Sequence, residues 1–465
     1  MKIEKLRLSA YFCTMNLKTD LICALATGNG IGAISIIRVS GPGAKSFLGT
    51  SFSKNLEHQA SHSIHFGLLK DLEGILIDEV LISVFDENKS FTGEESIEIS
   101  CHGSPFIQQQ ILALLCSLGC RLAGPGEFTQ RAFLNGKMDL SQAEAVADLI
   151  ASQSKQAHQI ALQQLRGNFS NELHSLREEL IHFASLVELE LDFSEEDVEF
   201  ADRSQLKTLV VNVLRILQRL AQSFALGNAL KTGVPVAIVG APNTGKSTLL
   251  NQFLGEERAI VSAIAGTTRD VIEETLNIDG IIFRLIDTAG IRETSEQIEA
   301  MGIARSKEKI ELASIVLCLA DAQNPDSIME VQEWKKSLQE QYPDKHIITL
   351  VNKADLAEAA LPGDLNISAK LGNGIEALKT LLVTLVMGDF DIQNETIVAS
   401  ARHFEALKNT IDALEKTSFS LEDSTSADFI AMDIRQAMYH LGTITGDIST
   451  DDLLGNIFSK FCIGK

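Results

Sequence analysis

The chain has 465 residues, of which 45% are hydrophobic, and its formal net charge is −22 at pH 7. That length leaves room for about three domains. An acidic surface repels nucleic-acid phosphates, which excludes RNA binding over the whole surface and leaves a local basic patch, a partner or weak binding.

The cysteines, the apolar runs and the first residues indicate the compartment. No apolar run approaches the roughly 18 residues of a membrane span, and the first 16 residues lack the continuous apolar core of a signal peptide. We therefore expect a cytoplasmic protein without membrane attachment. Seven cysteines without paired Cys-x-x-Cys spacing indicate reduced thiols, with neither a zinc site nor a disulfide framework: Cys13, Cys23, Cys101, Cys116, Cys120, Cys318 and Cys462.

The N-terminal part mixes short β-like runs with one helical pattern. The runs are Ala33–Val39, Val80–Phe85 and Ser96–Cys101, and the helix is expected over Pro105–Leu118. This mixture is typical of an α+β domain, which we place at residues 1–136.

Two helical stretches flank the middle of the chain. Apolar residues recur every three or four positions from Ala143 to Ile150 and from Leu206 to Leu217, and the pattern resumes over Ala401–Leu414 and Phe429–Leu441. We predict one α-helical central domain made of residues 137–230 and 389–465, with residues 231–388 inserted into it, because domain termini often lie close together. Two separate small bundles are the alternative.

A phosphate-binding loop opens the inserted part. The string Gly240-Ala-Pro-Asn-Thr-Gly-Lys-Ser247 follows the apolar run Val234–Val239 and precedes a helical pattern over Ser247–Leu254. This strand, glycine loop and helix predict that backbone N–H groups hold phosphates, that Lys246 reaches the terminal phosphates and that the Ser247 hydroxyl binds Mg²⁺. The predicted nucleotide contacts are Asn243, Thr244, Gly245, Lys246, Ser247 and Thr248.

Base selection is predicted further along, at Asn352-Lys353-Ala354-Asp355 after the apolar run Ile347–Val351. A carboxylate at Asp355 accepts from both the ring N–H and the exocyclic amine of guanine, whereas adenine has no matching pair of donors. GTP is therefore favoured over ATP. The string Ser368-Ala369-Lys370 is expected to brace the base from the other side.

Two further segments are predicted to sense the γ-phosphate. Asp287-Thr288-Ala289-Gly290 follows the strand-like run Ile281–Ile286, where Asp287 can hold a magnesium-bound water and the Gly290 N–H can meet the γ-phosphate. Upstream, Thr268 is chosen as a second Mg²⁺ ligand by its spacing. The nucleotide-binding residues expected in that upstream loop are Ser262, Ala263, Ile264, Ala265, Gly266, Thr267 and Thr268.

The position that carries a water-orienting glutamine in Ras-like enzymes is occupied here by Ile291, which cannot hydrogen-bond to water. A group elsewhere must orient the attacking water. A carboxylate on a mobile segment can do so, and the nearby candidates are Arg292, Glu293, Glu296 and Glu299.

These motifs and several strings outside the GTPase part resemble the MnmE (TrmE) family of tRNA modification GTPases. The resemblance covers nearly the whole chain and begins near Asp20, so residues 1–16 are an expected extension and Met15 is an alternative start. The strings that carry it are Gly240–Ser247, Gly266–Asp270, Asp287–Glu293, Ile36–Gly41, Phe91–Ile99, Gly124–Leu140 and Phe461–Lys465.

The resemblance implies a multidomain α/β protein: an α+β folate-binding-like domain, a helical domain and an inserted Ras-like P-loop GTPase. It implies a potassium-dependent GTPase that dimerises permanently through its N-terminal domain and transiently through its GTPase domains. In this family K⁺ acts where an arginine finger would, neutralising charge between the β- and γ-phosphates. The water-orienting glutamate falls on Glu299, and the K⁺ ligands fall on Asn243, Ser262, Ile264 and Thr267.

For the N-terminal domain the resemblance implies a site for 5,10-methylene- or 5-formyl-tetrahydrofolate, carried by Arg38, Glu98, Lys137 and Lys465. A glutamate can bind the amine and ring N–H of a pterin, and basic side chains can meet the carboxylates of its tail. Cys462, two residues before Gly464, is either a catalytic thiol or a small residue that lets the tail dock.

The implied activity is addition of an aminomethyl or carboxymethylaminomethyl group to C5 of the wobble uridine of certain tRNAs. It uses folate carbon, ammonium or glycine, and an FAD-binding partner, MnmG, in a heterotetramer or larger assembly. Because no strong basic run is present, we expect the partner to supply much of the grip on tRNA. The alternative is a regulatory GTPase of ribosome assembly, although the basic RNA-binding module usual in such proteins is missing here.

Overall fold

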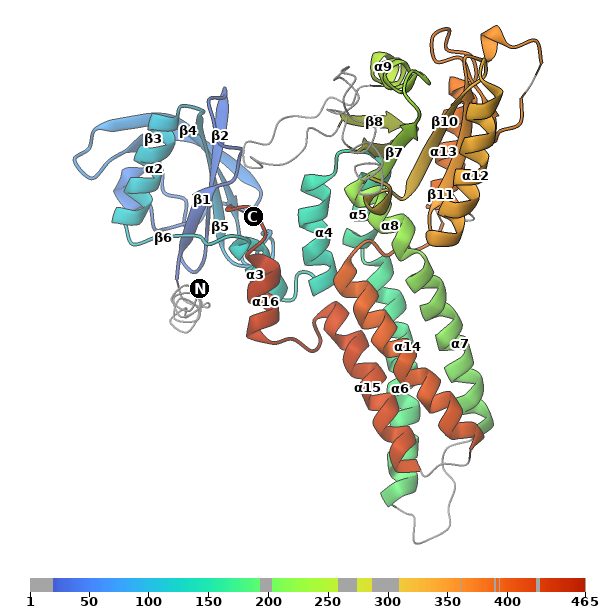
Figure 1. The fold of residues 1–465 in the computed structure, drawn as a ribbon. Coiled ribbons are helices and arrows are strands. Elements are labelled where there is room, and N and C mark those ends of the chain that lie inside the picture. Colours follow the sequence, from blue (N-terminus) through green and yellow to red (C-terminus); the bar gives the residue numbers. More distant parts are fainter. Residues whose placement is uncertain are drawn as a thin grey trace, which may run out of the picture. The chain divides into compact units, whose positions relative to one another are not determined.

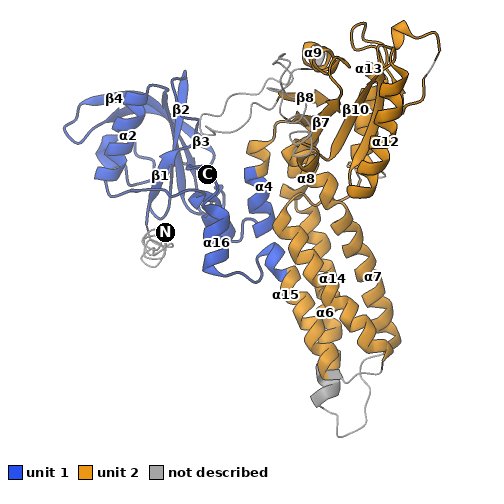
Figure 2. Cartoon of the chain, viewed as in Figure 1, with its two compact units in different colours: residues 1–147, 442–465 blue, residues 148–441 orange. Residues whose placement is uncertain are grey.

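The structure, a computed structural model (Figure 1), describes residues 20–192, 203–257, 274–286, 309–359, 361–388, 390–392, 394–423 and 427–464. Contacts divide the chain into two compact units, residues 1–147 with 442–465 and residues 148–441 (Figure 2). The first unit holds the N-terminal sheet, and the second holds the helical bundle and the nucleotide-binding sheet. The predicted domain limits at residues 136, 230 and 388 stay predictions.

The first unit is built on a six-stranded sheet in the order β3-β4-β5-β2-β1-β6, in which only the β1–β6 pair is parallel. Side chains alternate along each strand, so Ile97, Ile99 and Cys101 of β5 are buried in the core that contains residues of α2 (Pro105–Ser117). The strands are β1 (Ile22–Leu25), β2 (Ile34–Ser40), β3 (Ser63–Lys70), β4 (Leu76–Phe85), β5 (Ser96–His102) and β6 (Arg121–Leu122).

The C-terminal segment belongs to the same unit. Helix α16 (Asp451–Phe458) buries Leu454 and Phe458 in one cluster with Leu140 and Ala143, which lie on α4 (Leu140–Ala151). Beyond the helix, Ile463 forms an antiparallel bridge with Pro125, just before α3 (Glu127–Leu134). The last residues are thus docked on the segment that leads into α3.

The helices before and after the nucleotide-binding part pack together in the second unit. Leu206, Val213 and Leu217 form a buried stripe on α7, and α14 buries Leu407 and Leu414. The ion pair Lys207–Glu422, at 2.9 Å, joins α7 to the end of α14. The helices are α5 (Lys155–Leu165), α6 (Asn168–Asp192), α7 (Arg203–Gln222), α8 (Phe224–Thr232), α14 (Ala401–Glu422) and α15 (Ala427–Thr445) (Figure 1).

By length and hydropathy alone, one helical stretch of the described chain, residues 203–232, would reach across a membrane. Its apolar stripe is the one buried in the bundle, as in the core helix of a packed domain.

A second six-stranded sheet follows the order β12-β11-β10-β7-β9-β8 and is parallel except for the β8–β9 hairpin. Its strands are nearly continuous apolar runs because both faces are covered. The strands are β7 (Val234–Gly240), β8 (Glu274–Ile278), β9 (Ile281–Leu285), β10 (Ile315–Asp321), β11 (His346–Asn352) and β12 (Leu365–Asn366), and the helices are α9 (Lys246–Glu257), α12 (Pro325–Gln341) and α13 (Ile375–Met387). This is the predicted P-loop α/β fold.

The chain leaves the second sheet close to where it entered. After α13, the backbone N–H of Val398 donates to the buried Ser223 hydroxyl at 3.0 Å, and that hydroxyl donates to the Leu220 carbonyl at 2.7 Å. Gly227 of α8 faces the Val398 carbonyl, where a Cβ atom would lie 2.7 Å from the carbonyl carbon. The absence of a side chain at Gly227 therefore permits this crossing.

We expect Gly227→Ala to destabilise the second unit by about 1–3 kcal/mol, because the added methyl group meets backbone that cannot turn aside. Chemical denaturation followed by circular dichroism measures the loss. Gly255→Ala is the matched control, since a Cβ there meets nothing within 4 Å and alanine is the better helix former by about 1 kcal/mol. Equal midpoints for the two variants would contradict the packing argument.

Candidate functional site

The loop after β7 has the backbone geometry of a phosphate-binding loop. Gly240 and Gly245 adopt φ values of 154° and 96°, and Asn243 lies in the left-handed region at 64°, which asparagine tolerates better than most residues. At Gly240 a Cβ would lie 2.5 Å from the Leu319 carbonyl oxygen. The loop runs directly into the N-terminus of α9, whose unpaired N–H groups favour an anion.

The Lys246 side chain is held by backbone carbonyl groups of this loop. Its Nζ donates to the carbonyl oxygens of Gly240 and Ala241 at 2.9 and 2.7 Å. Burial lowers the pKa of Lys246, and the charge of Lys309 lowers it further. Within the described residues no carboxylate pairs with this ammonium group, and a phosphate would supply the compensating negative charge. Ser247 and Thr248, in the first turn of α9, are exposed.

The Asn352 side chain joins the three predicted segments. Its Nδ2 donates to the Thr244 carbonyl of the phosphate loop at 2.8 Å, and its Oδ1 accepts from the Ala369 N–H at 2.9 Å. Only 2% of Asn352 is exposed. Both ends of the amide are thus used to hold loops together, and the role that follows from this geometry is positioning.

The residues predicted to meet the base surround that amide. Asp355 lies in the short 3₁₀ turn Ala354–Leu356 with its side chain exposed, and Lys370 is also exposed. Ser368 is buried, and its N–H donates to the Asn373 carbonyl at 2.9 Å. Because the Asp355 side chain is exposed, its carboxylate can accept hydrogen bonds from a ligand.

Sequence reasoning missed Asp321, which ends β10. Its carboxylate pairs with Lys353 Nζ at 2.5 Å, and Lys353 itself takes the left-handed conformation with φ of 62°. The sequence did carry a signal for it, an acidic residue directly after the apolar run Ile315–Ala320. The carboxyl ends of parallel strands meet at one edge of the sheet, so such a residue lies close to the motifs that follow the neighbouring strands.

Several predicted residues lie outside the described residues: the 262–268 loop, Asp287–Gly290, Ile291 and the four water-orienting candidates Arg292, Glu293, Glu296 and Glu299. Lys465 of the predicted folate set also lies outside them, and so do residues 1–16.

In the first unit the structure brings two of the predicted folate residues into contact. Arg38 of β2 and Glu98 of β5 are direct partners in the sheet, and Nε and Nη2 of Arg38 lie 2.9 and 2.8 Å from Glu98 Oε1. Both contacts end on Oε1, and within the described residues no donor reaches Oε2. The side chains remain 19% and 25% exposed, so the pair presents donors and an acceptor side by side.

Lys137 and Cys462 lie on segments close to this pair. Lys137 Nζ donates to the Asn88 carbonyl at 3.0 Å, on the same loop as Phe91, whose ring contacts Arg38. The Cys462 carbonyl accepts from the Gly126 N–H at 3.3 Å, two residues before Phe128, the second ring against Arg38. Among the described cysteines, only Cys116 and Cys462 are exposed.

Comparison with known proteins covers both units. Residues 21–137 match the family model described as GTP-binding protein TrmE N-terminus, and residues 140–462 match that of the MnmE helical domain. The tRNA modification GTPase MnmE of Cytophaga hutchinsonii is 53% identical over 460 residues, which cover 97% of this chain and 99% of that protein. The chain belongs to the MnmE family of tRNA modification GTPases.

A second MnmE relative is similar over nearly the whole chain. The tRNA modification GTPase MnmE of Flavobacterium johnsoniae is 52% identical over 470 residues, covering 96% of this chain and 99% of that protein. Among solved structures, Aquifex aeolicus Era bound to GDP and aluminium fluoride is 27% identical over 38% of this chain and 66% of that chain, with a TM-score of 0.24. As an MnmE protein, the chain is a GTPase that acts in tRNA modification.

We expect Asn352→Asp to weaken GTP binding by at least about tenfold, because the carboxylate oxygen that replaces the amide nitrogen cannot donate to the Thr244 carbonyl and is buried against it. Isothermal titration calorimetry measures the affinity. Asn366→Asp is the matched control, because the Asn366 amide makes the same pair of contacts, with the N–H and carbonyl of Leu361. Similar losses in both variants would show that Asn352 has no special role in joining the loops.

Proposed function

We propose that this MnmE protein, with an FAD-binding partner of the MnmG type, adds an aminomethyl or carboxymethylaminomethyl group to C5 of the wobble uridine of certain tRNAs. The observation that carries the proposal is the 53% identity to an MnmE tRNA modification GTPase over 97% of the chain. The protein would act in the cytoplasm as a homodimer, within a heterotetramer or larger assembly.

In the proposed GTP site, the phosphates bind the N–H groups of the loop Gly240–Ser247 and the Lys246 ammonium, and guanine binds Asp355 between the Asn352 and Ser368 segments. The lowered pKa of Lys246 through burial and the exposed Asp355 carboxylate support this assignment. Ser247 and Thr268 would hold Mg²⁺, which supplies positive charge to the phosphates. The protein's own contribution is to orient the phosphates and select the base.

For hydrolysis, we assign Glu299 to orient the attacking water. Potassium, held by Asn243 with Ser262, Ile264 and Thr267, would supply the positive charge that an arginine finger supplies elsewhere. The left-handed backbone and the exposed side chain of Asn243 fit a ligand that faces out of the loop. Hydrolysis would drive a conformational cycle and leave the carbon transfer to the N-terminal unit.

For the carbon donor, we assign the pterin of 5,10-methylene- or 5-formyl-tetrahydrofolate to the Arg38–Glu98 pair. Glu98 Oε2 can accept from the pterin ring N–H and amine, while the exposed edge of Arg38 donates to its carbonyl. Lys137 and Lys465 would meet the carboxylates of the folate tail. Cys462 is either a nucleophile or the small residue at which the tail docks.

The negative charge of the chain bears on how tRNA is held. With a net charge of −22, the protein repels phosphate over much of its surface. We therefore assign much of the tRNA contact to the partner, whose reduced FAD would supply the electrons. Ammonium or glycine would supply the nitrogen.

The proposal is tested by nucleoside mass spectrometry of bulk tRNA from cells with and without the gene. We expect C5-aminomethyl-type wobble uridines to disappear in the deletion and to return with the wild-type gene. A catalytic thiol predicts that Cys462→Ser does not restore them, whereas a docking role predicts that it does. An unchanged nucleoside profile in the deletion would exclude the modification pathway and leave the ribosome-assembly alternative, for which subunit sedimentation profiles are the readout.

A second prediction concerns GTP turnover in KCl and NaCl at equal ionic strength. We expect turnover to be faster in KCl, and Glu299→Ala to lose about 100-fold or more in either salt, the size of effect typical of a lost general base. Glu311→Ala, which removes an exposed carboxylate of the same part of the chain, is the control. Equal rates in the two salts would refute the potassium assignment, and full activity of Glu299→Ala would refute the glutamate assignment.

A further inference from the structure

The Arg38 guanidinium is held by more than its ion pair with Glu98. Its central carbon lies 5.2 Å from the centroid of the Phe91 ring and 5.6 Å from that of the Phe128 ring, within the range of a cation–π contact. The two rings come from different segments, the loop before β5 and the first turn of α3. With Ile22, Ala24 and Ala123, they form one small apolar cluster.

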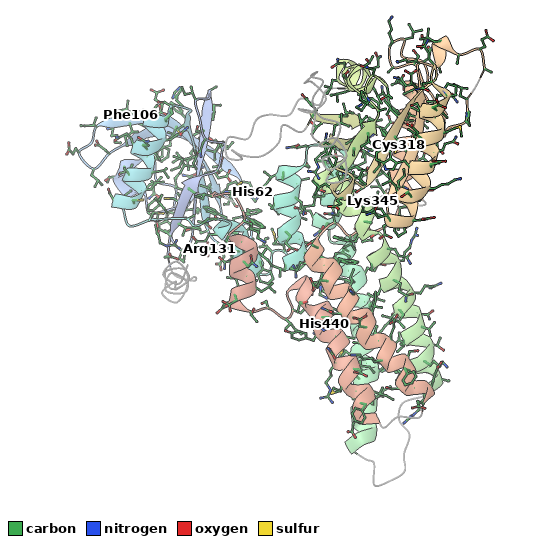
Figure 3. The ribbon with its side chains drawn as sticks, viewed as in Figure 1. His62, Phe106, Arg131, Cys318, Lys345 and His440 are labelled. Carbon is green, nitrogen blue, oxygen red and sulfur yellow. The ribbon has the colours of Figure 1, made fainter. Side chains whose placement is uncertain are left out.

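Arg131 lies one turn further along α3 (Figure 3) and is 1% exposed. Its Nη2 lies 2.7 Å from Asp20 Oδ1 and 3.1 Å from Glu127 Oε1. Its Nη1 lies 3.2 Å from Glu94 Oε1 and 3.0 Å from the Asp20 carbonyl oxygen. One buried guanidinium thus binds three separate carboxylates.

These contacts connect the two segments that carry the rings. Glu94 lies three residues after Phe91, and Glu127 directly precedes Phe128. Arg131 bridges Glu94 and Glu127, and the Ser40 hydroxyl donates to Glu94 Oε2 at 2.8 Å, next to the end of β2. If that bridge is lost, Asn135 at the end of α3 still donates to the Thr92 carbonyl of the loop at 2.8 Å. The first turn of α3, however, loses its ionic link to Glu94, and the two rings lose part of what fixes their common position.

Arg121 makes a comparison possible, because it belongs to the same ionic cluster. Its Nη2 and Nη1 lie 2.6 and 3.0 Å from Oε1 and Oε2 of Glu127, and its Nε lies 2.9 Å from Asp20 Oδ2. No contact links Arg121 to Glu94 in the part of the chain that the structure describes. Arg121 therefore holds the helix turn but not the loop.

The Glu127 carboxylate of this cluster is held in its charged form. Burial alone would raise the pKa of Glu127, but hydrogen bonds from Arg121 and the Gly124 N–H, with the charges of both arginines, hold it below its ordinary value. Since the carboxylate is already paired, the cluster is a poor acid or base, and its role is to fix geometry.

We propose that Arg131 is a positioning residue for the Arg38–Glu98 pair: by bridging Glu94 to Glu127 it fixes the Phe91 and Phe128 rings against the Arg38 guanidinium, and so sets the orientation in which that pair binds the pterin. The proposal rests on the proposed folate site and adds to it the residues that determine its shape.

The test measures binding of 5-formyl-tetrahydrofolate to the full-length protein by isothermal titration calorimetry. Arg131→Lys keeps the charge but cannot bridge two carboxylates in the plane of a guanidinium, so we expect about tenfold weaker binding. Arg121→Lys makes the same change in the same cluster and alters a contact with Glu127, but it leaves the contact between Arg131 and Glu94 in place, so it should bind within about twofold of wild type. Circular dichroism and GTP turnover, which depends on the other unit, should be unchanged in both.

A second pair of variants tests the ring contact itself. Phe91 is half-buried, so Phe91→Tyr can keep the ring against Arg38 with its hydroxyl in water, whereas Phe91→Leu removes the ring. We expect Phe91→Leu to weaken binding of 5-formyl-tetrahydrofolate about five- to tenfold and Phe91→Tyr to keep the wild-type affinity. In the double variant of Arg131→Lys and Phe91→Leu, the losses should be less than multiplicative, because both act on one contact.

The outcomes separate this proposal from the folate site. If wild type does not bind the folate, the folate site is refuted and the proposal falls with it. If wild type binds and Arg131→Lys binds equally well, or Arg121→Lys is weakened as much, or the losses in the double variant multiply, the folate site stands and the positioning role of Arg131 is refuted.

Discussion

The second unit depends on the close approach of α8 to the segment that follows the nucleotide-binding sheet. Ser223 binds the Val398 N–H at 3.0 Å, and Gly227 leaves room for the Val398 carbonyl. On either side of this crossing, Leu226, Leu230, Ile397 and Ala399 join the core of the sheet. A single apolar core therefore runs from the sheet into the first turns of the bundle, and a displacement of one must be felt by the other.

Much of the fold followed from local sequence patterns. Apolar runs of strand length, a glycine loop and three- or four-residue periodicity predict their elements because each depends on neighbours along the chain. The helical pieces on either side of the nucleotide-binding sheet were also expected to pack together. The order of strands in the first sheet was not predictable, since β1 pairs with β6 across about 100 residues without any pattern that identifies partners.

Within the candidate sites, too, some residues were predictable from local sequence and others were not. Gly240, Lys246 and Asp355 belong to contiguous motifs, so the sequence identified them, whereas the bridge made by Asn352 and the pairing of Asp321 with Lys353 needed the fold. The Arg131 cluster could not be predicted from the sequence, because the contact of Arg131 with Asp20 spans 111 positions and charged residues are rarely buried. Arg38 and Glu98 were identified by family resemblance, and their direct pairing emerged only with the sheet register.

The distribution of thiols makes the C-terminal segment accessible to chemical labelling. Burial raises the pKa of Cys101 to about 11 and that of Cys318, inside the second sheet, to about 12, so neither reacts readily as a thiolate. Cys116 and Cys462 are the exposed thiols of the described chain. With Cys13 and Cys116 replaced, a maleimide fluorophore on Cys462 would lie beside Gly126. Its fluorescence polarisation would report in real time whether that segment is bound or released.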